Sequence, residues 1–275
     1  MSAVVTYLFK MQGAVQAQWM KNAMVTYTLY KCLYWLVDFS LLFSPDNIIY
    51  HNNVQLSWWK NGAFILFNHP TPLCSGIFIG LIFLISLYIL FGSKFHRLAF
   101  FILWLLVSNI NNNVFCTMTG GDVLFQHLLF FCMFLSNGKQ KQDPVITDLD
   151  TAIHNSGVIA LHMQVCLVYF LNGLAKLSDM DWLNGNALSD SLAIHEFSLP
   201  MFYESKGTFT AILNYLVIWY QLLFPVLVYI KKIKKWYLLL GVIQQLFIIF
   251  ILGLPSFGLI MIVAYAIFYS PSKKT

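Results

Sequence analysis

The sequence predicts an all-α, polytopic integral membrane protein with about eight transmembrane helices and both termini in the cytoplasm. Three observations predict this fold class: the scarcity of charge, the spacing of long apolar runs and the placement of the basic residues. Of the 275 residues, 59% are hydrophobic and 10% are charged, whereas soluble domains carry roughly 25% charged residues. A charge at the centre of a membrane helix costs about 2.5–3.5 kcal/mol, so a lipid environment explains the deficit.

The apolar runs recur along the chain as candidates for spanning helices, although Val123–Leu135 is short. A spanning helix needs about 20 mainly apolar residues. Up to residue 230 the runs are Val25–Phe43 (interrupted by Lys31 and Asp38), Leu73–Gly92, Leu98–Ile110, Val123–Leu135, Ile153–Leu177 and Phe209–Ile230.

The last apolar stretch, Trp236–Tyr269, is too long for one spanning helix. As a single helix it would measure about 51 Å, against a hydrocarbon core of about 30 Å. Gly253 and Pro255 lie in its middle, and proline interrupts a helix because it lacks the backbone N–H. We therefore expect two helices here.

The basic residues indicate the orientation. With the N-terminus inside, most Lys and Arg fall in short inner segments, as the positive-inside rule requires. The inner segments hold Lys10, Lys21, Lys94, Arg97, Lys139, Lys141, Lys231, Lys232, Lys234, Lys235, Lys273 and Lys274, whereas the outer loops hold Lys60, Lys176 and Lys206. Because membrane orientation accounts for this placement, the net charge of +5 does not indicate a nucleic-acid partner. One membrane domain, residues 1–275, fits the length.

The most informative stretch lies at the outer end of the fifth predicted helix. At about 100° per residue, Asn172, Tyr169 and His162 each project within about 40° of the direction of Lys176. Two interpretations fit this polar face. Lys176 can be a base at the mouth of a cavity lined by Asn172 and Tyr169. Alternatively, Lys176 reaches toward the headgroups and the other side chains bond neighbouring helices. Trp182 is an interfacial anchor under either interpretation.

The role of a base sets a condition on the surroundings of Lys176. A lysine works as a base only where burial lowers its pKa toward neutrality. A carboxylate such as Asp179 or Asp181 beside it would instead keep the amine charged.

A second polar constellation, Asn111–Asp122, joins the third and fourth predicted helices on the same outer side. Its amides can line a polar cavity, and adjacent glycines permit close backbone approach to a ligand. The alternative is a plain turn with Asp122 as the N-cap of the fourth helix. The candidate cavity residues here are Asn112, Asn113, Gly120, Gly121 and Asp122.

Other signals are weak. His127 and His154 lack a Cys or carboxylate at metal-ligand spacing, so we expect structural histidines and no metal site. No zinc-protease, nucleophile-elbow or phosphate-loop motif is present in the sequence.

The stretch YFLNGLAKLSDMDWLNGNAL, Tyr169–Leu188, resembles the signature of the horizontally transferred transmembrane domain family. That family is similar to the membrane part of vitamin K-dependent gamma-glutamyl carboxylase. The stretches NNNVFCTMTGGDVLF and GLPSFGLIMIVAYAIF resemble its Asn-rich turn and its closing helix. The matching signature positions are Tyr169, Phe170, Gly173, Lys176, Leu177, Trp182, Gly185, Ala187 and Leu188.

The resemblance implies an outward-facing base at Lys176, since the matching lysine of the carboxylase deprotonates reduced vitamin K. It also implies a reduced naphthoquinone as the cofactor. Two departures bear on catalysis: Gln221 stands where the family often has Glu, and Gln244–Gln245 where it often has His. Among short relatives, the chain looks most like the branch that matures a bacterial sporulation-delaying peptide toxin.

Two functions from different classes follow. The first is a carboxylase-like enzyme of the bacterial inner membrane that acts at the outer side on a secreted peptide or a lipid-soluble quinone. The second is a non-catalytic scaffold or anchoring subunit of a membrane complex, in which the polar helix face binds neighbouring helices and the outer loops bind a partner.

Overall fold

The computed structural model is all-α and describes residues 13–44, 71–92, 94–136, 144–195, 199–203 and 207–269. The chain divides into two compact units, Met1–Leu161 with Tyr269–Thr275, and His162–Phe268. The predicted outer loop up to residue 70, with Trp58–Lys60, lies outside the described residues, as do Glu196, Glu204 and Lys206.

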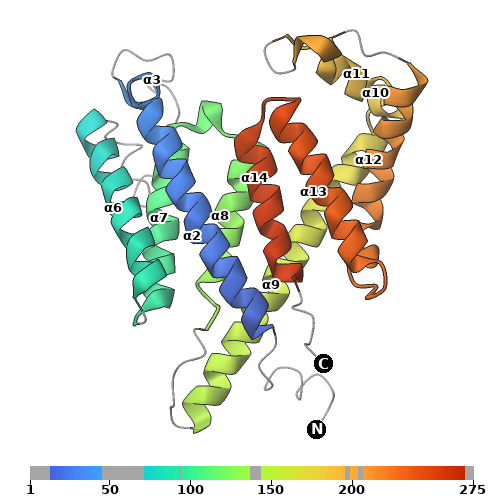
Figure 1. Ribbon diagram of the computed structural model, residues 1–275. Coiled ribbons are helices and arrows are strands. Elements are labelled where there is room, and N and C mark those ends of the chain that lie inside the picture. Colours follow the sequence, from blue (N-terminus) through green and yellow to red (C-terminus); the bar gives the residue numbers. More distant parts are fainter. Residues whose placement is uncertain are drawn as a thin grey trace. The chain divides into compact units, whose positions relative to one another are not determined.

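The first unit is built from long helices (Figure 1). Helix α2 packs against α6 and α8, and α7 packs against the same two helices. Thr71 caps α6 by accepting a hydrogen bond from the Cys74 N–H, and Pro72 occupies the first turn, where no N–H is needed. The elements are α2 (Ala14–Val37), α3 (Phe39–Phe43), α6 (Pro72–Phe91), α7 (His96–Asn113), η1 (Phe115–Thr117), α8 (Gly120–Cys132) and the first part of α9 (Pro144–Leu177).

The first helix differs from the prediction at both ends. It begins at Ala14, well before the apolar run, and it breaks at Asp38 into the short helix α3. Ala17, Met20 and Met24 are fully buried at helical spacing. Because polar residues lie between them, this stretch does not read as an apolar run in the sequence, and the prediction began the helix later.

The second unit holds the rest of α9 and the elements that follow it (Figure 1). The predicted break in the last apolar stretch is confirmed, because α13 and α14 are separate helices that pack against each other. Gly253 has φ 62°, and Pro255 begins α14. The elements are α10 (Met180–Leu183), α11 (Ala187–Leu192), η2 (Pro200–Phe202), α12 (Thr208–Leu227), α13 (Lys234–Phe250), α14 (Pro255–Ala264) and η3 (Tyr265–Phe268).

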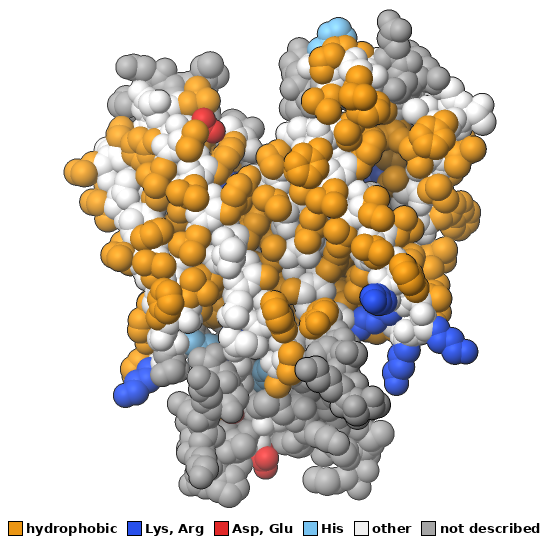
Figure 2. Space-filling model, viewed as in Figure 1, with side chains coloured by type: hydrophobic (Ala, Val, Ile, Leu, Met, Phe, Trp, Pro, Cys, Tyr) orange, Lys and Arg blue, Asp and Glu red, His pale blue; other side chains and the backbone are white. Residues whose placement is uncertain are grey.

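Three helical segments are long and apolar enough to cross a membrane: Pro72–Phe91, Asp148–Leu177 and Thr208–Leu227. Pro255–Phe268 is a shorter apolar helix. Hydrophobic side chains cover much of the face drawn in Figure 2, and large ones such as Leu73 and Phe209 are more than 70% exposed. Apolar surface on this scale suggests a multi-pass membrane protein.

Candidate functional site

Lys176 lies in the last turn of α9, where it is half-buried. Its Nζ is 4.6 Å from the centroid of the Trp182 ring, at a distance typical of a cation–π contact. Among the described residues no carboxylate forms an ion pair with it. Trp182, expected as an anchor, therefore also holds the lysine amine.

The other residues of the predicted polar face do not gather around Lys176. Asn172 is exposed, and its amide donates back to the Val168 carbonyl at 2.7 Å. Tyr169 is 1% exposed within an aromatic cluster, and His162 packs edge-on against Phe268 at 4.8 Å. These side chains share a direction on α9 but lie in separate surroundings, so the structure describes no cavity that Lys176, Asn172 and Tyr169 enclose.

The segment after Lys176 folds back onto α12 through hydrogen bonds that the sequence did not predict. Asn214, fully buried on α12, donates to the Trp182 carbonyl at 2.7 Å and accepts from the Leu188 N–H at 3.3 Å. The next residue, Tyr215, donates to the Leu183 carbonyl at 2.8 Å. We call Asn214, Tyr215 and the backbone groups that they bind the clasp. It fixes the backbone of Trp182, the residue that holds Lys176.

The two glycines of the signature have structural reasons to be glycine. A Cβ on Gly173 would lie 3.0 Å from the Leu222 backbone nitrogen. Because glycine has no side chain, α9 can approach α12 closely at this position. Gly185 has φ 79°, and a Cβ there would lie 3.1 Å from the Ala211 Cβ. Both positions bring the signature segment against α12, as the clasp does.

Tyr169 belongs to a buried group of hydrogen-bonded phenols from α9, α12 and η3. Its hydroxyl bonds to the Tyr265 hydroxyl, which bonds to the Tyr220 hydroxyl at 3.2 Å. The Tyr169 ring also stacks on Phe224, with centroids 4.1 Å apart. A Cβ on Gly241 would overlap the Tyr220 and Tyr265 hydroxyls, so only glycine lets them meet beside α13.

Gln245 on α13 is joined to this phenol cluster. Gln245 is 1% exposed, and its Nε2 donates to the Tyr169 hydroxyl at 3.3 Å. Its Oε1 has no hydrogen-bond partner among the described residues, and neither has Oε1 of Gln221. Both amides therefore lie inside the second unit with an acceptor unsatisfied.

The Asn-rich constellation is a helix end and a helix start, not one connecting loop. Asn112 and Asn113 lie in the last turn of α7, where their amides donate to the Ser108 carbonyl at 2.6 Å and the Ser75 hydroxyl at 3.4 Å. Gly120 and Gly121 begin α8. The N-cap is Thr119, and Asp122 is the third residue of a capping box, so Asp122 as the N-cap was wrong.

Asp122 also forms an ion pair that links distant parts of the first unit. Its carboxylate lies 2.8 Å from Lys31 Nζ on α2, and the two side chains are only 4% and 5% exposed. The Lys31 amine also lies 4.7 Å from the Tyr34 ring centroid and 5.5 Å from that of Trp35. The Asp122 carboxylate is thus ion-paired with Lys31. Neither interpretation of Asp122 from the sequence included this ion pair.

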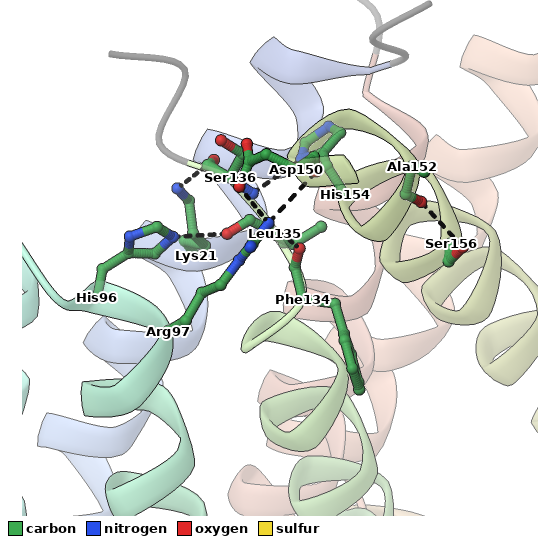
Figure 3. A network of polar contacts seen from close by, with 10 residues as sticks. All are labelled: Lys21, His96, Arg97, Phe134, Leu135, Ser136, Asp150, Ala152, His154 and Ser156. Carbon is green, nitrogen blue, oxygen red and sulfur yellow. Dashed lines mark hydrogen bonds and ion pairs between the residues drawn. The ribbon is translucent and has the colours of Figure 1, made fainter. Parts of the chain in front are cut away.

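A second polar network ends α8 (Figure 3). Three consecutive carbonyl groups, those of residues 134–136, accept hydrogen bonds from basic side chains. The contacts are Arg97 Nη2 to Phe134 at 3.2 Å, His96 Nε2 to Leu135 at 2.6 Å and Lys21 Nζ to Ser136 at 2.9 Å. Basic groups stabilise a helix C-terminus. Lys21, which is only 2% exposed, therefore has a structural role within the first unit.

His154 and Asp150 complete this network from α9. The Ser136 N–H donates to His154 Nδ1 at 2.9 Å, and Arg97 forms an ion pair with Asp150 at 2.8 Å. Within the part of the chain that the structure describes, no three His, Cys, Asp or Glu side chains are grouped as a metal would need.

The comparisons with known proteins add no relative: no protein-family model matches the chain, and no curated protein and no solved structure matches it either.

Proposed function

We propose that the chain is a multi-pass protein of a bacterial inner membrane, with about eight spanning helices and both termini in the cytoplasm. The three long apolar helices support the membrane environment. The inward excess of Lys and Arg supports the orientation. In this topology Lys176 and the clasp face the outside, whereas the network at the end of α8 and Lys231–Lys235 face the cytoplasm.

Labelling of single cysteines in a cysteine-free background tests this topology. Position 233 should stay unlabelled when an impermeant thiol reagent is added to intact cells, and position 184, exposed beside α10, should react. Both should react after the membrane is permeabilised. Labelling of position 233 from outside would exclude this arrangement.

We further propose that the protein is a carboxylase-like membrane enzyme that acts at the outer side in the maturation of a secreted peptide, with Lys176 as its base. The observation that carries this proposal is the contact of the Lys176 amine with Trp182, together with the lack of an ion pair to a carboxylate among the described residues; Asp179 acts on the amine only from a longer distance. An adjacent carboxylate would hold the amine charged, whereas a ring face accepts no conventional hydrogen bond from it.

A reduced naphthoquinone, the cofactor that the resemblance implies, fits these residues poorly. The buried Gln245 Oε1 is an acceptor without a partner among the described residues, and it lies beside Tyr169. Lys176, however, is two helical turns farther along α9, about 10 Å away. A quinol hydroxyl bonded to Gln245 would therefore lie out of reach of the proposed base. This favours the secreted peptide as the substrate.

Replacing Lys176 tests the catalytic proposal. Lys176→Met keeps the apolar stem and removes the amine, and loss of an acid–base group lowers a rate by about 10²–10⁴-fold. The readout is a mass spectrum of the secreted peptides in the culture medium, compared between cells with and without the unmodified chain to identify the peptide that depends on it. Lys235→Met is the matched control, since Lys235 also lies near a tryptophan ring, at 6.0 Å from Trp236. Normal peptide output from Lys176→Met would contradict the enzyme proposal.

The second candidate function is a scaffold that anchors a partner. It is favoured by the clasp, in which Asn214 and Tyr215 are committed to internal hydrogen bonds and not to a cavity. Asn214→Leu should lower the output of an enzyme and of a scaffold alike, because the clasp also fixes the backbone of Trp182, which contacts Lys176. A scaffold should keep its output when Lys176 is replaced by Met, so Lys176→Met separates the two functions.

A further inference from the structure

A polar pocket of about 520 Å³ lies in the second unit between α11 and the start of α12. One wall is formed by Asn186, Ser189 and Asp190, and the opposite wall by Thr208 and Thr210. Its volume lies within the range of small-ligand sites, roughly 300–1,000 Å³.

The lining carries one charged side chain, that of Asp190. Asp190 is exposed, and no ion pair with another described residue involves its carboxylate. The nearby hydroxyls use their protons internally: Ser189 donates to the Asn186 carbonyl at 2.7 Å and Thr210 to the Gly207 carbonyl at 2.8 Å. Their oxygens can still accept hydrogen bonds. The pocket therefore offers acceptors and a negative charge, which suit an ammonium or guanidinium group.

The same lining suits a lipid-soluble quinone badly. Among the lining residues only Ala211 carries an apolar side chain, and none is aromatic. Pockets for flat apolar ligands are lined mainly by hydrophobic and aromatic side chains. A polar, water-exposed segment of a peptide is the better match.

The clasp connects this pocket to Lys176. Asn214 holds the backbone of Trp182, and Thr210 in the pocket wall lies one turn earlier on α12, about 6 Å along the helix axis. Gly185, packed against Ala211, brings the turn before α11 to the same part of α12. An extended peptide covers about 3.3–3.6 Å per residue, so about two residues beyond a group held in the pocket span the rise from Thr210 to Asn214, whose amide binds the Trp182 backbone.

From this arrangement we infer that the substrate is a secreted peptide with a basic side chain that binds Asp190 in this pocket, while a neighbouring residue of the peptide reaches Lys176. The inference rests on the proposed function and names its substrate class. It makes Asp190 a specificity residue and gives it no part in proton transfer.

Peptide binding to the full chain in nanodiscs tests the inference. The probe is a decapeptide of Gly and Ser with one central Arg and a neutral dye, and its twin has Gln in place of Arg. Fluorescence anisotropy at low salt should show about tenfold tighter binding of the Arg peptide, as expected for one charge-assisted hydrogen bond. Asp190→Asn should remove this preference. Asp181→Asn should keep it, because Asp181 is an exposed carboxylate outside the pocket lining.

A second variant reduces the volume of the pocket and leaves the charge of Asp190 unchanged. Thr208 is exposed at the rim, so Thr208→Trp should fill the pocket without disturbing the core and should weaken binding of both peptides. Equal binding of the two peptides to the unmodified protein, or a preference for Arg that survives Asp190→Asn, would overturn the inference.

Lys176→Met separates this inference from the proposed catalysis. The variant should bind the Arg peptide as the unmodified protein does. If binding depends on Asp190 while peptide maturation does not depend on Lys176, the base is wrong and the docking site stands. If maturation needs Lys176 and the Arg preference is absent, the reverse holds.

Discussion

Lys31 in the first unit and Lys176 in the second make a direct comparison, because each is a lysine on a long helix with its amine beside aromatic rings. Lys31 lies 4.7 Å from the Tyr34 ring centroid, and Lys176 lies 4.6 Å from that of Trp182. They differ in their acidic partner. Lys31 is ion-paired with Asp122 at 2.8 Å and is 4% exposed, whereas Lys176 is half-buried without an ion pair among the described residues.

The difference indicates what each lysine can do. A buried charge that lost its partner would be strongly destabilising, so the pair of Lys31 and Asp122 holds α2 and α8 together and keeps both charges fixed. The amine of Lys176 forms no ion pair with a described residue, and this is the condition that the proposed base requires. The aromatic contact is common to both lysines, so the ion pair with Asp122 is the feature that distinguishes the structural Lys31 from Lys176.

The largest effect is expected from breaking the ion pair of Lys31. Asp122→Asn leaves the Lys31 amine buried without a counter-charge, which should lower the free energy of unfolding by about 3–5 kcal/mol. Unfolding of the purified protein in mixed micelles measures it. The double variant Lys31→Met with Asp122→Asn removes both charges and should recover most of the loss. A cost below about 1 kcal/mol for Asp122→Asn would remove the contrast with Lys176.

A smaller loss should follow from opening the clasp. Asn214→Leu keeps the volume but leaves the Trp182 carbonyl and the Leu188 N–H unpaired, at about 1–3 kcal/mol for an unsatisfied buried group. Tyr215→Phe removes one hydrogen bond of a more exposed residue and should cost less, about 1 kcal/mol. The same unfolding assay ranks the two. Equal effects would mean that Asn214 does not fix the Trp182 backbone.

The smallest effect on stability should come from the second lysine itself. Lys176→Met removes a half-buried cation–π contact, worth about 0.5–1 kcal/mol at exposed sites. The free energies of unfolding of Lys176→Met and Asp122→Asn, measured in the same assay, show how much each lysine contributes to stability. A loss as large as that of Asp122→Asn would show that Lys176 is a structural lysine too, which would weaken its assignment as a base.

The local features of the fold could be predicted from the sequence. The break at Gly253 and Pro255 is predictable because it follows from the backbone limits of those two residues alone. The α6 helix is predictable because its apolar run has few interruptions. The start of α2 at Ala14 was missed because Lys21 looks like a loop residue until its acceptor, the Ser136 carbonyl, is known.

The candidate site was less predictable, because its contacts join residues far apart in sequence. The helical spacing placed Tyr169 beside Lys176, but the phenols of Tyr220 and Tyr265 draw its hydroxyl to another environment. The partner of Asp122 lies 91 positions away in the chain, and that of Asn214 lies 32 positions away. The spacing of residues along one helix carries no information on such partners.

The phenol cluster has a consequence for how the second unit enters the membrane. Tyr169 bonds to a hydroxyl 96 positions later in the chain, and Tyr220 bonds to the same hydroxyl 45 positions later. While the chain is being synthesised, both phenols therefore enter before their shared partner, Tyr265. An unpaired hydroxyl in lipid is costly, so until η3 follows, α9 and α12 must keep these groups hydrated or bonded elsewhere. Helix α13, which comes earlier, supplies the first partners, the Tyr237 carbonyl for Tyr220 and the Gln245 amide for Tyr169. The phenol cluster is therefore expected to be completed last, when Tyr265 arrives beside Gly241.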